Sequence, residues 1–154
     1  MIIKKVAIPG VVFLLSMSLL SFKLPVICKS QGIKGHVYLI KGNQMPSPDI
    51  KPGPLKGFST SIYIYELTST SQVKKDGISP FYRAINTKLV KVVKSDKNGS
   101  FKVSLKPGEY SLFIKKDTLF FANRLDGRNN INPVKVDSCQ FANLDIRADY
   151  DAVY

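Results

Sequence analysis

The sequence predicts an all-β protein, an antiparallel Greek-key β-sandwich of about seven strands. Short segments rich in Val, Ile, Tyr and Phe alternate apolar and polar residues, with the period of a half-buried strand. Turn residues separate these segments, and no stretch after residue 30 keeps apolar residues at the helical spacing of three and four. Each predicted sheet has one apolar face, so two sheets packed face to face would bury both.

Residues 1–30 have the pattern of a signal peptide, and residues 31–154 form the predicted domain. Lys4 and Lys5 precede an almost uninterrupted apolar run over residues 6–22. The small residues near the end of this segment favour cleavage after Ser30. An uncleaved leader is the alternative, because the run has the length of a short membrane-spanning helix. We expect export to the periplasm or the cell surface, with a membrane anchor as the other outcome.

Cys28 also allows a lipoprotein interpretation, in which an acylated cysteine becomes the first residue of the mature protein. Bulky Ile27 departs from the small residue that precedes a lipidated cysteine. If cleavage follows Ser30, Cys139 is the only cysteine left. No disulfide can then form within one chain, and a hydrophobic core has to supply the stability.

The chain is basic, with 23 Lys and Arg against 11 Asp and Glu. Removing the four lysines of the leader leaves 19 basic against 11 acidic residues, a net charge of +8. The lysines are spread over strands and turns, where they keep sheet edges and faces soluble. No motif of stacking aromatics with interleaved arginines is present, so we do not expect nucleic acid as a partner.

The strands follow from alternation between turn signals. In the second strand, Ile62 and Ile64 lie on one face and Tyr63 and Tyr65 on the other. The predicted strands cover residues 33–40, 61–67, 87–94, 100–105, 109–115 and 119–122, with a last extended region at 134–136 and 141–146.

A turn at residues 96–99 separates the third and fourth strands. Gly99 supplies the positive φ that would close these two strands into a hairpin. A second turn, at Pro107 and Gly108, leads into the fifth strand. One face of the fourth and fifth strands is apolar and should point into the core: Phe101, Val103, Leu105, Tyr110, Leu112 and Ile114.

Two stretches do not fit the strand pattern. Residues 42–57 contain four prolines, so they cannot pair as a central strand and are predicted to form an extended surface loop. Residues 68–83 are polar, with Gly77 and Pro80, and are predicted to form a second long loop or a poorly ordered excursion.

The run from Ser95 to Leu112, with Gly99, Phe101 and Tyr110 at fixed places, resembles the carboxypeptidase regulatory-like, or transthyretin-like (prealbumin-like), β-sandwich family. Residues 35–37 resemble its opening strand. The specific part of the match covers residues 86–115, and the proline-rich loop departs from the brief connection of that family. The sequence is also similar to small exported envelope proteins of Bacteroidetes-type bacteria, and this resemblance implies a binding, spacing or assembly role by analogy.

His36, the single histidine of the chain, is the first candidate for a catalytic residue. One histidine in a strand is more typical of a structural residue than of a general base, so we do not expect an enzyme. Hydroxyisourate hydrolases of the transthyretin-like family carry several catalytic His and Arg residues and a Tyr-Arg-Gly-Ser ending. This chain ends differently, with residues 148–154, so that activity is not expected.

No cofactor or metal is expected either. One histidine and one mature cysteine cannot form a zinc site with a recognisable spacing. Residues 96–99 resemble the start of a calcium loop, but Pro107 stands where such a loop has its last acidic ligand. The sequence therefore favours a turn at this place.

Two segments are candidates for interaction. Prolines hold the loop around Met45, Pro46, Ser47 and Pro48 extended, so it could be presented to a partner or remain a solvated loop. The C-terminal tail alternates acidic with apolar or aromatic residues. It could pack as a last strand or be offered to another protein by strand addition, through Asp149, Tyr150, Asp151 and Tyr154.

The expected function is a non-catalytic module for binding or assembly in the bacterial envelope, with an envelope protein or glycan as partner. The alternative is a carbohydrate-binding module, and an enzyme is the third hypothesis. The carbohydrate alternative requires an outward-facing aromatic platform formed by Tyr63, Tyr65, Tyr82 and Phe113.

Overall fold

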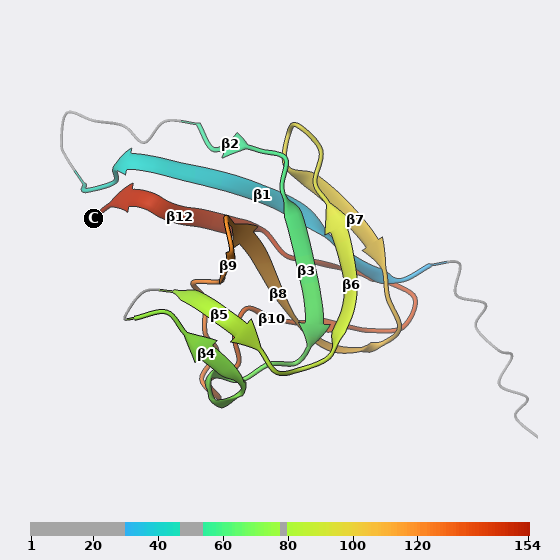
Figure 1. Ribbon diagram of the computed structural model, residues 1–154. Coiled ribbons are helices and arrows are strands. Elements are labelled where there is room, and N and C mark those ends of the chain that lie inside the picture. Colours follow the sequence, from blue (N-terminus) through green and yellow to red (C-terminus); the bar gives the residue numbers. More distant parts are fainter. Residues whose placement is uncertain (1–29, 47–53, 78–79) are drawn as a thin grey trace, which may run out of the picture.

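The computed structural model describes residues 30–46, 54–77 and 80–154, so the leader, Cys28, Ser47 and Pro48 lie outside the described residues. The described part is an all-β sandwich of two sheets, as the sequence predicts (Figure 1). It contains twelve strands rather than about seven, because the last predicted region gives three strands and three further strands occur in stretches predicted as loops. They are β1 (Gly32–Asn43), β2 (Lys56–Gly57), β3 (Ser61–Glu66), β4 (Val73–Lys75), β5 (Phe81–Ile85), β6 (Leu89–Lys94), β7 (Ser100–Ser104), β8 (Gly108–Lys116), β9 (Leu119–Phe121), β10 (Pro133–Val136), β11 (Phe141–Asn143) and β12 (Ile146–Val153).

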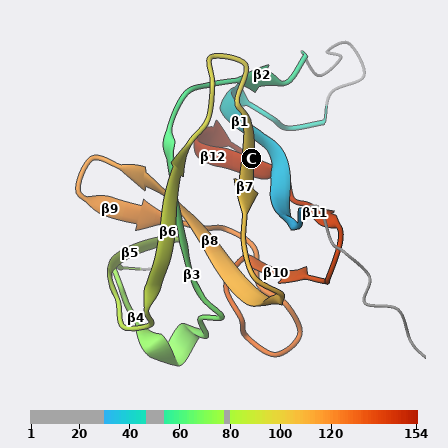
Figure 2. The ribbon, with the colours of Figure 1, turned by 90° about the vertical axis from the view of Figure 1, so that its right-hand side faces the viewer.

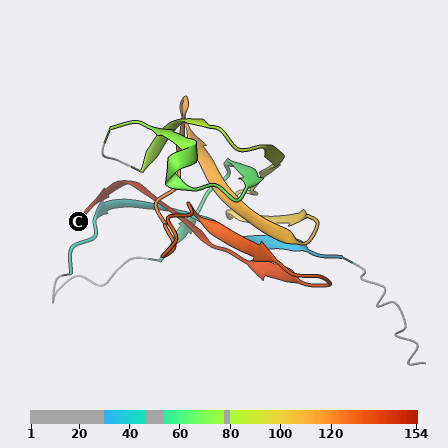
Figure 3. The same ribbon diagram turned by 90° about the horizontal axis from the view of Figure 1, so that it is seen from below.

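The smaller, five-stranded sheet is built around β1. On one side β1 pairs antiparallel with β7 and β2, and on the other side it pairs parallel with β11 and β12. The C-terminal strand therefore lies beside the first strand (Figure 3). At Gly35, the Leu144 carbonyl oxygen lies 2.0 Å from the place of a Cβ atom, so only glycine allows this close approach.

The larger sheet has the order β4-β5-β9-β8-β3-β6, and β10 also pairs with β8. Its pairs are antiparallel. At one end of this order β6 pairs only with β3, so it is an edge strand.

The main core lies between the two sheets, where the predicted inward residues of β7 and β8 are all buried. Ile62 and Ile64 are fully buried in the same cluster, which confirms the predicted faces of β3. Burying a side chain of this size contributes roughly 1.5–3 kcal/mol. The fully buried side chains of this cluster also include Ile33, Val37, Leu112 and Phe121.

A second apolar cluster covers the outer face of β8. Phe113 is fully buried there and packs with Tyr65 and Tyr82, so β8 is buried on both faces rather than one. Part of the cover comes from β4 and β5, which fall mostly in the stretch 68–83 that was predicted as a long loop or a poorly ordered excursion. The described residues of that stretch form a short 3-10 helix (Thr70–Gln72), β4 and the start of β5, since Val73 and Tyr82, with Ile85 just beyond it, supply an apolar face.

The predicted hairpin at residues 96–99 is also wrong. The turn exists, but β6 pairs with β3 in one sheet and β7 pairs with β1 in the other, so the two strands separate beyond the turn (Figure 2). The turn is held against β1 by a hydrogen bond of 2.9 Å from the Val37 N–H to the Gly99 carbonyl. Gly99 has φ +82°, so the glycine itself is required as predicted, but it bridges two sheets.

Candidate functional site

His36 lies on β1 in a shallow surface hollow that Ser100 and Asp145 also line. The Asp145 Oδ1 atom accepts a hydrogen bond of 2.8 Å from the His36 backbone N–H and lies 3.8 Å from the imidazole Nδ1. The second distance is too long for a hydrogen bond, and no hydrogen bond joins Ser100 to the imidazole among the described residues. The aspartate therefore fixes the backbone of β1 rather than orienting the imidazole as a base.

The side chain of Asp96 stabilises the turn at residues 96–99. The Asp96 Oδ1 atom accepts hydrogen bonds from the backbone N–H groups of Asn98 and Ser100, at 2.8 and 2.9 Å. Among residues 30–46, 54–77 and 80–154, no group of acidic, histidine or cysteine side chains is placed to hold a metal ion. Over the same ranges, no helix has the length and apolarity needed to cross a membrane.

The aromatic platform predicted for carbohydrate binding does not form. Tyr65, Tyr82 and Phe113 are buried in the second apolar cluster, and burial raises the pKa of both tyrosine hydroxyls. Only Tyr63 reaches the surface in part, beside the ring of Phe120. The alternation of side chains along the strands correctly places Tyr63, Tyr65 and Phe113 on one face of the sheet. It could not show that β4 and β5 cover that face.

The C-terminal tail packs as the last strand, because β12 extends to Val153 and pairs with β1 up to that residue. Tyr150 is half-buried, and its ring centroid lies 5.2 Å from that of Phe121, in an edge-to-face contact. Lys116 covers the same ring at 4.0 Å and forms an ion pair of 2.6 Å with Asp151. These contacts bind the tail to the larger sheet, so residues 149–154 are not a free segment.

A groove lies between the tail, strand β5 and the segment that follows β9, with a cavity volume of about 540 Å³. The side chains of Phe81, Tyr150 and Tyr154 line it together with Asn123 and Asp149. The Asn123 amide donates to the Asp149 carboxylate at 2.7 Å, and the Tyr154 hydroxyl donates to the other carboxylate oxygen at 3.1 Å. We call this hollow the tail groove. It combines aromatic surface with an ordered set of polar atoms.

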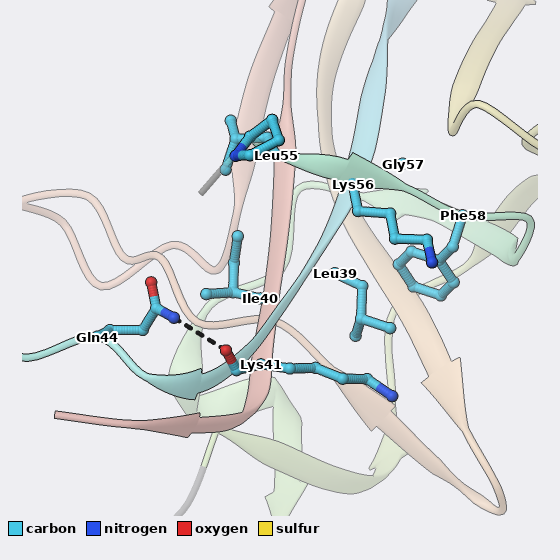
Figure 4. A pocket seen from close by; sticks show the side chains of 9 residues that line it. Leu39, Ile40, Lys41, Gln44, Leu55, Lys56, Gly57 and Phe58 are labelled. Carbon is cyan, nitrogen blue, oxygen red and sulfur yellow. Dashed lines mark hydrogen bonds between the residues drawn. The ribbon is translucent and has the colours of Figure 1, made fainter. Parts of the chain in front are cut away.

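A second hollow, of about 340 Å³, lies beside the proline-rich loop between the C-terminal end of β1 and β2 (Figure 4). Its wall combines apolar side chains with Gln44, Lys41 and Lys56, and Figure 4 shows both lysine side chains there. Of the predicted interaction loop, Met45 is exposed and its backbone N–H donates to the Asn43 side chain at 2.9 Å. Ser47 and Pro48 of that loop lie outside the described residues.

The unpaired side of β6 carries the third surface feature. Leu89, Val90 and Val92 are exposed by 44%, 38% and 45%. Val92 lies opposite Tyr63 and Leu89 opposite Tyr65, so both extend the outer face of the sheet toward its edge. The sequence predicted an ordinary strand here. The available signal was two apolar pairs, Leu89-Val90 and Val92-Val93, each of which lies between lysines.

Comparison of the chain with known protein families, with characterised proteins and with solved structures finds no match. The fold and the hollows define the class: a two-sheet β-sandwich protein with an open edge at β6 and a groove along its last strand.

Proposed function

We propose that this chain is an exported, non-catalytic binding module of the bacterial envelope, and that it holds a protein partner at the β6 edge. The observation that carries the proposal is the edge itself. Strand β6 pairs on one side only, and three neighbouring apolar side chains on it stay exposed. Single exposed apolar residues are ordinary, whereas a contiguous group on an open edge is typical of an interaction site.

The charge on this edge favours one kind of partner. Lys88, Lys91 and Lys94 lie in or next to β6, and no acidic residue occurs between them. Lysines and a bulge near Val90 protect a sheet edge from pairing with a copy of itself. An extended segment with alternating apolar and acidic side chains would satisfy both the open backbone groups and the positive charge, by strand addition.

Export is part of the same proposal. The lysines and apolar run of residues 4–22 support it, and so does the disulfide at Cys139, because disulfides persist in oxidising compartments. The two-sheet sandwich is compatible with the carboxypeptidase regulatory-like family, which the sequence resembles. By analogy, that resemblance implies a role in binding, spacing or assembly.

The proposal is tested by placing a photo-crosslinking amino acid at position 92 in the protein expressed in its own envelope. The matched control carries it at Val153, which is equally apolar and 62% exposed but lies on β12. We expect one partner to crosslink at position 92 through a segment containing Asp or Glu, and to be lost when Leu89→Lys is added to the same strand. Equal crosslinking at both positions, or a partner unaffected by Leu89→Lys, would contradict the proposal.

A further inference from the structure

The tail groove lies far from the β6 edge in the strand order of the larger sheet, and none of its lining residues belongs to β3 or β6. Its volume of about 540 Å³ falls within the range of about 300–1,000 Å³ that small-molecule sites occupy. Residues from four separate parts of the chain meet there: Lys75 of β4, β5 with the residue before it, the segment after β9, and β12 with Tyr154. Such a hollow requires the complete fold.

The polar atoms of the tail groove are fixed but not saturated. The Asn123 amide nitrogen donates to the Arg147 carbonyl and to Asp149, while its side-chain oxygen accepts no hydrogen bond from the described residues. Each Asp149 carboxylate oxygen accepts one hydrogen bond and keeps capacity for another. The groove therefore offers several oriented acceptors to a ligand that carries hydroxyl donors.

The apolar part of the groove is aromatic. Tyr154 is 67% exposed, and Phe81 and Tyr150 are half-buried with their ring centroids 6.1 Å apart. Aromatic rings give large contact area with little loss of side-chain freedom, and tyrosine adds a polar end to an apolar face. A ligand with flat C–H faces between its hydroxyl groups matches this surface.

The charge of the lining decides between classes of ligand. Among the described residues that line the groove, only Lys75 and Asp149 have formally charged side chains, and these two charges cancel. A cation would meet Lys75 and also Lys116, which already covers the ring of Tyr150. An anion would meet the Asp149 carboxylate. A neutral ligand incurs neither penalty, since no unpaired charge has to be desolvated.

We propose that the tail groove binds a neutral saccharide, with its ring faces against Tyr154 and Phe81 and its hydroxyl groups donating to Asn123 and Asp149. This site is separate from the β6 edge, so it does not depend on the proposed function. The saccharide site shares only Tyr82 with the aromatic platform that the sequence predicted.

The test is a titration of the full exported chain with maltose, cellobiose, mannobiose and chitobiose, followed by NMR of the backbone amides. At millimolar concentrations we expect one or more of these disaccharides to shift the signals of Asn123 and Tyr154, but not those of Val92. Tyr154→Ala should weaken binding about tenfold, and Tyr154→Phe should weaken it less because the ring stays. Val153→Ala is the matched control, because Val153 is similarly exposed but does not line the groove.

Tetramethylammonium chloride and sodium acetate serve as charged probes. Larger shifts at the groove with either of them than with any disaccharide would overturn the proposal. An absence of shifts with all four disaccharides would overturn it as well, and so would equal weakening by Tyr154→Ala and Val153→Ala. Crosslinking at position 92 is a separate measurement, so the β6 proposal can fail or succeed independently.

Discussion

Ser95 and Thr60 exchange two hydrogen bonds: the Thr60 N–H donates to the Ser95 hydroxyl oxygen at 2.9 Å, and the Ser95 N–H donates to the Thr60 carbonyl at 2.9 Å. Ser95 is 2% exposed, and its hydroxyl also donates to the Phe58 carbonyl at 2.9 Å. One buried hydroxyl thus joins the segment before β3 to the end of β6, next to the turn that passes between the sheets.

We predict that Ser95→Ala lowers the free energy of unfolding by about 1–3 kcal/mol, because it leaves the part-buried Thr60 N–H and Phe58 carbonyl without their partner. Urea unfolding measures this change. Ser104→Ala, on the exposed face of β7, is the control and should stay within about 0.5 kcal/mol of the wild type. Equal effects of the two changes would show that the buried hydroxyl is replaceable.

Gly99→Ala should destabilise the protein more than Gly42→Ala, although both glycines have positive φ. An added methyl group is strained at either place by about 1–2 kcal/mol. At Gly99 the Cβ atom would also stand 2.2 Å from the Val37 carbonyl oxygen, whereas at Gly42 nothing lies within 4 Å. The difference between the two unfolding free energies measures the close contact between the turn and β1, and a difference of zero would disprove that contact.

The tail should behave as a structural strand. Tyr150→Ala is expected to lower the free energy of unfolding by about 1–3 kcal/mol, because it removes ring contacts with Phe121 and Phe81. Val153→Ala should change it by less than about 0.5 kcal/mol. Thermal unfolding of both variants checks this. If Tyr150→Ala is neutral, the tail does not contribute to the folded domain.

Asp126 should titrate below the ordinary aspartate range. The side-chain hydrogen bond from Asn130, together with the backbone N–H groups of Asn130 and Arg128, lowers the pKa of its carboxyl. A lowered folded-state pKa means that this stabilisation is present above the unfolded pKa and is lost as the pH falls through the folded value. NMR titration of the carboxyl carbon follows the midpoint, which Asn130→Ala should raise; an unchanged midpoint would assign the shift to another cause.

Cys139 is disulfide-bonded, and Cys28, the only other cysteine of the chain, lies outside the described residues. We predict that Cys139 of the exported protein resists alkylation until the protein is reduced, as measured by intact mass. A disulfide within one mature chain requires any cleavage to fall before Cys28, and not after Ser30. A mature chain that begins at Gln31 with an alkylatable Cys139 would contradict this prediction.

The features of the fold that could be predicted from the sequence are those that depend on the alternation of apolar and polar residues within one strand. The opposite faces of Ile62 and Tyr63 follow from the period of a strand, and so does the burial of Phe101 and Leu112. Pairing between distant strands leaves no local trace, so the sequence could not show that β6 and β7 belong to different sheets.

The tail groove could not be predicted for the same reason. Asn123 and Asp149 are 26 residues apart and become neighbours because β12 of the smaller sheet lies beside the segment that follows β9 of the larger one. Phe81 belongs to a segment whose polar composition indicated a loop. The tail itself was a candidate from its alternation of acidic and aromatic residues, but the residues that complete the site had no signal.

The pairing of β1 with β12 also sets an order of events for the nascent chain. Contacts such as that between His36 and Asp145 span 109 positions of sequence, so the first strand cannot complete its sheet until the last one is available. Folding dominated by such long-range pairs is slow, because the chain loses the entropy of closing a long loop before the stabilising contacts form. Truncation near the C-terminus therefore leaves β1 as an open edge, and incompletely synthesised chains should be the species most prone to aggregation and proteolysis.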